Sequence, residues 1–269
     1  GATAGINRIV SLFGLHEAAA AGPKPLVLIG PYEHHSNILP WRESGAEVVE
    51  IPEAAAGGPD LGALDAALRE TDAGRLRIGA FSAASNVTGI VTDPDPVTAL
   101  LKRHGALAVW DYAGGGPYLP IDMRGGTPFE KDAVVFSPHK FVGGPGASGV
   151  MIVRKAAVSR KRPVFSGGGT VRFVSPWGHD YSDDIAVREE AGTPNVIADL
   201  RSAMAILVKE AIGQDHMDAR HAETRKRASD AWRRNGNIEL LENPRAHHVL
   251  PIFSMRIRDP GIGGYVHQQ

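Results

Sequence analysis

The part of this 269-residue chain best suited to chemistry surrounds Lys140. Lys140 follows a short apolar run, Ala133–Phe136, and precedes the glycine-rich residues 141–146. A lysine at the carboxyl end of a parallel strand lies in the crevice where such sheets bind ligands, and partial burial there would favour a nucleophilic amine. Taken alone, a loop lysine is more often a plain surface residue. The glycine-rich stretch is not a Walker phosphate loop, since no Gly-Lys-Ser/Thr follows it.

An acidic residue, Asp111, ends another apolar run, Ala106–Trp110. An aspartate in this place is often only a helix cap or a turn former. Together with Lys140 it indicates pyridoxal 5'-phosphate (PLP), because PLP needs a lysine for a Schiff base and an anion facing its pyridine nitrogen. The anion keeps that nitrogen protonated, so the ring can accept electrons from the α-carbon of a substrate.

Two adjacent histidines, His34 and His35, follow the apolar run Leu26–Gly30. Neighbouring side chains diverge in direction, and neither a thiolate nor a regular histidine spacing accompanies them, which argues against a metal site. A flat imidazole placed over a cofactor ring is the better functional interpretation, and a histidine with a structural hydrogen bond is the alternative. A metal-dependent hydrolase built on this pair is the least supported hypothesis.

Small and polar residues also occur where a phosphate or a helix cap is expected. Residues 1–7 open a helix, whose free N–H groups and dipole suit a phosphate, and Thr3 can add a hydroxyl. Residues 82–89 follow the apolar run Arg77–Phe81. In the plain structural interpretation, Thr193 is simply the N-cap of the next helix, with Pro194 at its first position.

The elements that must position these residues alternate between short apolar runs and helical stretches, which predicts an α/β fold with a mostly parallel sheet between helices. The expected strands are Leu26–Gly30, Glu47–Ile51, Arg77–Phe81, Ala106–Trp110, Ala133–Phe136 and Ser148–Val153. The expected helices are Ile6–Leu15, Ile38–Ser44, Asp60–Glu70, Asp95–His104, Val196–Ile212 and Asp215–Asn235.

The alternation of apolar runs and helical stretches stops in residues 163–194, which we expect to form a long loop. His247–Ile257 is expected to be a strand of a second, smaller domain. We therefore expect a large domain over residues 1–212, and a linking helix with the start of a small C-terminal domain over residues 213–269. Because the chain lacks an initiator Met and begins within a helix, we expect a fragment without its N-terminal segment and with a truncated small domain.

Composition narrows the class of protein further. Hydrophobic residues make up 43% of the chain, so a sizeable core can be buried, and no apolar run approaches the length of a membrane span. The net charge of -1 gives no reason to expect nucleic acid or an anionic membrane as a partner. The chain has no cysteine, which excludes disulfides and thiolate chemistry within it and fits the cytoplasm, where we expect the protein.

The polar segments, in their order and spacing, resemble the class V aminotransferase family and, within it, the cysteine desulfurase and selenocysteine lyase branch. The segments that carry the resemblance are Glu33-His34-His35-Ser36-Asn37, Ser85-Asn86-Val87-Thr88-Gly89, Ser137-Pro138-His139-Lys140 and Ala191-Gly192-Thr193-Pro194-Asn195. The likeness extends from Gly1 to about Ile212. It implies the type I fold of PLP enzymes, an amino-acid substrate, and a homodimer with shared active sites.

The resemblance also implies a role for each matched residue. Lys140 would form the Schiff base, Asp111 would pair with the pyridine nitrogen, and His34 would stack on the ring. Asn86 would lie near the phenolic oxygen of the ring or the substrate carboxylate. The phosphate would be held by Ala2, Thr3, Ser137 and His139. The threonine matching Thr193 reaches the phosphate in the neighbouring subunit.

Some features depart from the family. Gly114 stands where many relatives have a glutamine three residues after the aspartate. A persulfide-carrying cysteine and the domain with a carboxylate-binding arginine are not found, and Arg172 matches no family role. Cleavage of the C–S bond of a cysteine-like substrate and transamination therefore both stay open. The alternative from another class is a non-catalytic or inactive truncated fragment that keeps the fold as a binding or dimerisation module.

Overall fold

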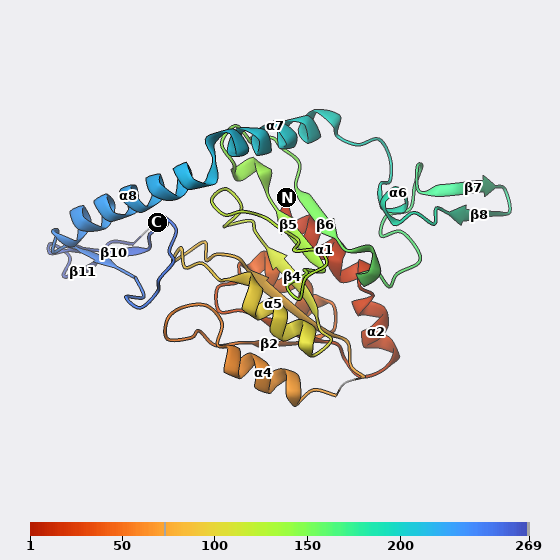
Figure 1. Cartoon of the computed structure of the whole chain (residues 1–269), viewed down its shortest axis with the longest axis horizontal. Coiled ribbons are helices and arrows are strands. Elements are labelled where there is room, and N and C mark those ends of the chain that lie inside the picture. Colours follow the sequence, from red (N-terminus) through yellow and green to blue (C-terminus); the bar gives the residue numbers. More distant parts are fainter. Residues whose placement is uncertain (73, 268–269) are drawn as a thin grey trace.

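A computed structural model describes residues 1–72 and 74–267 of the chain, and a six-stranded sheet lies at its centre (Figure 1). The strands are β1 Leu26–Ile29, β2 Glu47–Glu50, β3 Arg77–Ser82, β4 Leu107–Asp111, β5 Ala133–Phe136 and β6 Val150–Val153, in the spatial order β2-β1-β3-β4-β5-β6. Every neighbouring pair is parallel except β5 and β6. The predicted α/β fold with a mostly parallel sheet is confirmed, and all six predicted strands form.

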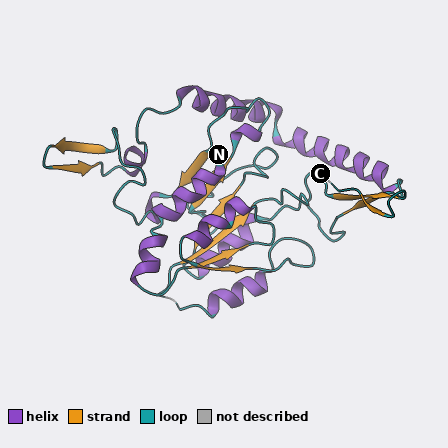
Figure 2. Cartoon of the chain, turned by 180° about the vertical axis from the view of Figure 1, so that it is seen from behind, coloured by secondary structure: helices purple, strands orange, loops and turns teal. Residues whose placement is uncertain are grey.

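Helices cover both faces of this sheet (Figure 2). The helices are α1 Ala2–Leu12, α2 Leu15–Ala21, α3 Leu39–Glu43, α4 Leu61–Arg69, α5 Pro94–Arg103, α6 Ile185–Glu189, α7 Val196–Ile212 and α8 Gln214–Arg233. Side chains of successive strand residues point to opposite faces. Leu28 and Trp110 accordingly pack in the cluster that contains α4 and α5, whereas Ile29 and Val109 pack in the cluster that contains α1.

Side-chain caps set the start of several helices. Asp60 begins α4, where its carboxylate accepts hydrogen bonds from the N–H groups of Gly62 (2.8 Å) and Ala63 (3.0 Å). The alternative interpretation of Thr193 as the cap of α7 is wrong, because Asn195 caps it by accepting a hydrogen bond from the N–H of Ala198 at 3.3 Å. An amide oxygen satisfies a free helical N–H as well as a hydroxyl does, so the sequence pattern did not distinguish them.

The prediction of a long loop over residues 163–194 is also wrong. The strands β7 Val171–Ser175 and β8 Gly178–Tyr181 form an antiparallel hairpin, and α6 follows it. The hairpin projects away from the central sheet (Figure 1), and Trp177 in its turn is 93% exposed. With both faces open to solvent, the hairpin shows none of the apolar alternation that marks a half-buried strand.

The C-terminal region runs along α8 to a separate three-stranded antiparallel sheet of β9 Ile238–Leu240, β10 Met255–Asp259 and β11 Gly264–Tyr265. The strand predicted over 247–257 starts only at Met255, because the preceding residues cross to the central body, where Val249 forms a single bridge with Ile90. The division of the chain into two domains at residue 212 stays a proposal. The last two residues of the predicted C-terminal region, 268 and 269, lie outside the described part of the chain. None of the described helices combines the length and apolar character needed to cross a membrane.

Candidate active site

The carboxyl ends of β1, β3, β4 and β5 meet at one edge of the sheet, because these four strands are adjacent and parallel. A cavity of about 190 Å³ lies there. It is lined by Gly1, Ala2, Thr3, His34, Ser36, Ser82, Ala84, Asn86, Asp111, Ala113, Gly114, Ser137, His139 and Lys140. Eight of the nine residues predicted from the sequence are thus brought together from positions as far apart as 2 and 140, and Thr193 is not among them.

Asp111 is the buried acid of this cavity. Asp111 is 3% exposed, and its Oδ1 accepts a hydrogen bond from the N–H of Ala113 at 2.7 Å. Burial raises the pKa of the Asp111 carboxyl to about 6, while the Ala113 hydrogen bond and the Lys140 cation oppose that rise. Within the described part of the chain Asp111 forms no ion pair, so its charge is available to a ligand.

Lys140 closes a short 3-10 turn, Pro138–Lys140, directly after β5. Its N–H donates to the carbonyl of Ser137 at 2.9 Å, and Phe141 behind it is buried. Gly144 allows the chain to fold back tightly there, since a Cβ at this position would lie 1.8 Å from the carbonyl oxygen of Pro138. Lys140 lines the cavity but is an exposed residue of this structure.

His34 lies in the turn between β1 and α3. Its Nδ1 accepts a hydrogen bond from the N–H of Ser36 at 3.1 Å, which leaves the proton of the neutral ring on Nε2. Partial desolvation, followed by the nearby His35 and Lys140, lowers the pKa of His34. A neutral imidazole with a defined tautomer therefore borders the cavity.

The N-terminus of α1 forms another wall of the cavity. The N–H of Ala2 donates to Oγ of Ser137 at 3.0 Å. A Cβ on Gly1 would lie 3.1 Å from Cε1 of His139, so these two residues are also close. The first turn of α1 contains no acidic residue. The N-terminus of this helix, a hydroxyl and an imidazole converge here, and this combination can hold a phosphate group.

Asn86 and Gly114 lie next to each other in the cavity lining. A Cβ at position 114 would lie 3.7 Å from Cβ of Asn86 and 3.3 Å from the carbonyl oxygen of Ala84. The missing side chain at Gly114 therefore leaves space beside Asn86. A side chain can be added there only with a small adjustment of its neighbours.

Three polar residues at or behind the cavity had been given no role from the sequence. Ser36 and Ser82 line the cavity, and Glu33 binds Ser82 from behind it. The signal for Ser82 was present, because it ends β3 in register with Asp111 of β4. Glu33 gave no signal of its own beyond its place in the His34 motif.

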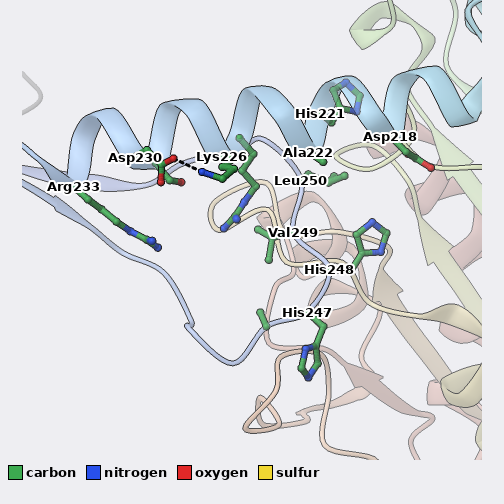
Figure 3. Close-up of a pocket in the computed structure, with 13 residues that line it drawn as sticks. Asp218, His221, Ala222, Lys226, Asp230, Arg233, His247, His248, Val249 and Leu250 are labelled. Carbon is green, nitrogen blue, oxygen red and sulfur yellow. Dashed lines mark hydrogen bonds and ion pairs between the residues drawn. The ribbon is translucent and has the colours of Figure 1, made fainter.

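A second hollow, of about 460 Å³, lies far along the chain between α8 and residues 246–250 (Figure 3). It contains several cations, but these already have acidic partners: Lys226 pairs with Asp230 at 2.6 Å, and Arg225 pairs with Glu242 at 3.4 Å. The larger hollow also holds acids, a lysine and histidines, but among the described residues the buried acid without an ion pair, Asp111, lies in the smaller cavity together with Lys140 and His34. We therefore take the smaller cavity as the candidate active site.

Comparisons with known proteins agree with this assignment. The sequence model of the family described as aminotransferase class-V matches residues 1–262. A probable cysteine desulfurase from Vibrio cholerae is 30% identical over 273 residues, covering 100% of this chain and 65% of its own length. A probable cysteine desulfurase from Halalkalibacterium halodurans is 29% identical over 86% of this chain and 55% of its own length.

Solved structures give the same answer for the fold. The cysteine desulfurase CsdA from Escherichia coli superposes with a TM-score of 0.76 at 25% identity, covering 95% of this chain and 61% of that one. The apo cysteine desulfurase from Thermococcus onnurineus also reaches 0.76, at 22% identity, over 97% of this chain and 62% of that one. The chain spans about half to two thirds of the length of these relatives. With the family match extending over 262 residues, the chain belongs to the class V aminotransferase family.

Proposed function

We propose that this chain forms the cofactor-binding part of a PLP enzyme that acts on an amino acid. The observation that carries the proposal is the joint placement of Lys140, Asp111 and His34 around one cavity at the carboxyl edge of the sheet. The cysteine desulfurase names of its relatives support C–S bond cleavage of a cysteine-like substrate, and transamination is the other reaction open to the same residues.

The residues present fit PLP. Asp111 is a buried carboxyl without a cation partner in the described structure, which suits a protonated pyridine nitrogen. The N-terminus of α1, with Ser137 and His139, offers donors for the phosphate. The exposed Lys140 is free to reach the aldehyde carbon of the cofactor. When bound, the cofactor would supply a ring that accepts electrons from the substrate α-carbon.

The chain's own residues then have distinct tasks. Asp111 would keep the pyridine nitrogen protonated, and His34 would border the ring of the bound cofactor. Lys140 would hold the cofactor through its amine, and the same amine could move a proton to and from the substrate α-carbon. Asn86 can donate its amide to the phenolic oxygen of the ring or to the substrate carboxylate, and Thr3 adds a hydroxyl toward the phosphate.

We also propose a homodimer with shared sites. Thr193 is exposed and lies outside the cavity lining of its own chain, so any phosphate that it contacts would belong to a second copy. An apolar stripe on α7 supports the same view: Ile197, Leu200, Met204 and Leu207 are each more than half exposed. Sedimentation analysis should give twice the chain mass; a monomer over the micromolar range would contradict this.

Lys140→Ala tests the function. The wild-type protein mixed with PLP should show a visible absorbance band, and borohydride reduction should leave a pyridoxyl group on the peptide that contains Lys140. Lys140→Ala should lose both while keeping its circular dichroism spectrum, and Lys24→Ala, an exposed lysine away from the cavity, should keep both. A reduced adduct on another lysine, or none on the folded wild type, would contradict the assignment.

A further inference from the structure

The turn that carries His34 is attached to the sheet by one carboxylate. Oε1 of Glu33 accepts a hydrogen bond from the N–H of Ser82 at 2.8 Å, and Oε2 accepts from the hydroxyl of Ser82 at 2.6 Å. Ser82 is the last residue of β3 and lies in register with Asp111. The side chain before His34 therefore reaches across 49 residues of sequence to the strand end beside the buried acid.

The same carboxylate also connects the turn to the core. Asn37 is fully buried, and its amide donates to Oε2 of Glu33 at 2.5 Å. The carbonyl oxygen of that amide accepts a hydrogen bond from the indole of Trp41 at 2.9 Å, and Trp41 is fully buried in α3. Glu33 is thus the centre of a chain of contacts from α3 to β3.

The surroundings of Glu33 suit a carboxylate and not an amide. All three of its partners donate, and an ionised carboxylate is a group that only accepts. Burial raises the pKa of Glu33 to about 7, and the hydrogen bonds from Ser82 and Asn37 oppose that rise. Asp111 is the charged group that faces it from β4, and its charge adds to the rise. Glutamine has the same shape, but its NH₂ group would meet a donor.

The backbone is also arranged around this side chain. A Cβ on Gly30 would lie 2.9 Å from Oε1 of Glu33 and 3.0 Å from the ring of Phe81. The absence of a side chain at position 30 leaves room for the carboxylate to fold back over the end of β1.

We propose that Glu33 is the positioning residue of this site: by binding Ser82 and Asn37 it holds His34 in the orientation that faces the cofactor ring. The inference rests on the proposed function. Glu33 itself does not line the cavity, so its effect on the cofactor must pass through its neighbours, either the turn with His34 or Ser82 and Asp111 at the strand ends. A purely structural role would weaken the fold without depending on His34.

A double-mutant cycle separates these two roles. The dissociation constant of PLP is measured for wild type, Glu33→Gln, His34→Ala and the double variant. Glu33→Gln should weaken PLP binding by about tenfold, the loss expected for one charged hydrogen bond. In the His34→Ala background the same change should have no further effect, because the residue through which it acts is gone. Glu50→Gln, exposed at the end of β2, is the matched control and should stay at the wild-type value.

Equal losses in the two backgrounds, or no loss in either, would overturn the proposal. If Glu33→Gln does not fold, Gly30→Ala gives the same test, because it displaces the carboxylate without entering the cavity. Imidazole nitrogen NMR on cofactor-free protein gives a second readout: Glu33→Gln should convert the single His34 tautomer into a mixture. An unchanged His34 tautomer would overturn the positioning role of Glu33, whether or not the wild type binds PLP. A wild type that binds no PLP would instead contradict the proposed function.

Discussion

Two buried aspartates lie at opposite ends of neighbouring strands, and their surroundings differ. Asp111 ends β4 at the cavity, whereas Asp132 directly precedes β5 at the other edge of the sheet. Asp132 is fully buried, and its carboxylate is bound by Lys102, by Arg154 and by the N–H of Ala108 at 2.8 Å. Asp111 has a single backbone hydrogen bond and no ion pair in the described structure.

The difference shows that the two edges of one sheet serve different purposes: the acid at one edge stabilises the fold, and the acid at the carboxyl edge is left for a ligand. A buried carboxylate with two cations is a satisfied group whose removal leaves uncompensated charge. A buried carboxylate without a cation lowers the stability of the empty protein but keeps its charge for a ligand. Unpaired buried charge at the carboxyl edge is thus the physical mark of the site.

The largest effect should come from the paired acid. Asp132→Ala should lower the free energy of unfolding by about 4 kcal/mol, because it leaves Lys102, Arg154 and a strand N–H without their acceptor. Urea denaturation of cofactor-free protein measures this. PLP affinity of the folded variant should stay within about twofold, since changes at distant sites act independently. A loss below 1 kcal/mol would break the comparison.

The unpaired acid should behave in the opposite way. Asp111→Asn should weaken PLP binding about 100-fold, because the pyridine nitrogen loses a buried charged partner. The free energy of unfolding of the cofactor-free variant should not fall, since the asparagine can still accept from Ala113 and no buried charge is left. Retained affinity with lost stability would show that Asp111 is structural.

The same variant sharpens the comparison through pH. The pKa of Asp111 rises from its ordinary value of 3.8 to about 6 on folding. As the pH rises, the unfolded chain therefore loses this proton at a lower pH than the folded chain. The cofactor-free wild type should therefore lose stability relative to Asp111→Asn as the pH rises from 4 to 6, by at most about 3 kcal/mol. Denaturation curves at several pH values test the sign; a parallel pH dependence of the two proteins would contradict it.

The smallest effect is expected at Gly114, next to the unpaired acid. Gly114→Gln should cost about 1 kcal/mol of stability, since the added Cβ lies 3.3 Å from the carbonyl oxygen of Ala84 and its neighbours must yield slightly. Its amide should reach the phenolic oxygen of bound PLP and shift the visible absorbance band. Gly114→Ala, which adds only the Cβ, is the control and should leave the band in place.

Much of this arrangement could be predicted from the sequence because it depends on local pattern. The apolar runs Leu26–Gly30 and Ala133–Phe136 are continuous, as parallel strands covered on both faces must be, and both form strands. Parallel strands place the residues that follow them at one edge, so Lys140, Asp111 and His34 were expected to meet, and they do.

Other features could not be predicted in this way. The hairpin of β7 and β8 has too few buried residues to show a strand pattern, and the segment around Val249 is held by contacts with residues 89–91 instead of a strand partner in its own sheet. The exposure of Lys140 depends on which other segments cover it, and local sequence does not contain that information.

The sequence by itself determined the kinds of element, the fold class and the set of residues at the carboxyl edge, because periodicity and strand ends are local properties. Only the tertiary structure decided which buried acid is neutralised and which is left for a ligand. Arg154 reaches Asp132 across 22 residues, and Glu33 reaches Ser82 across 49. Tertiary packing brings such distant residues into contact, and it therefore decides which buried acid is paired with cations and which keeps its charge at the site.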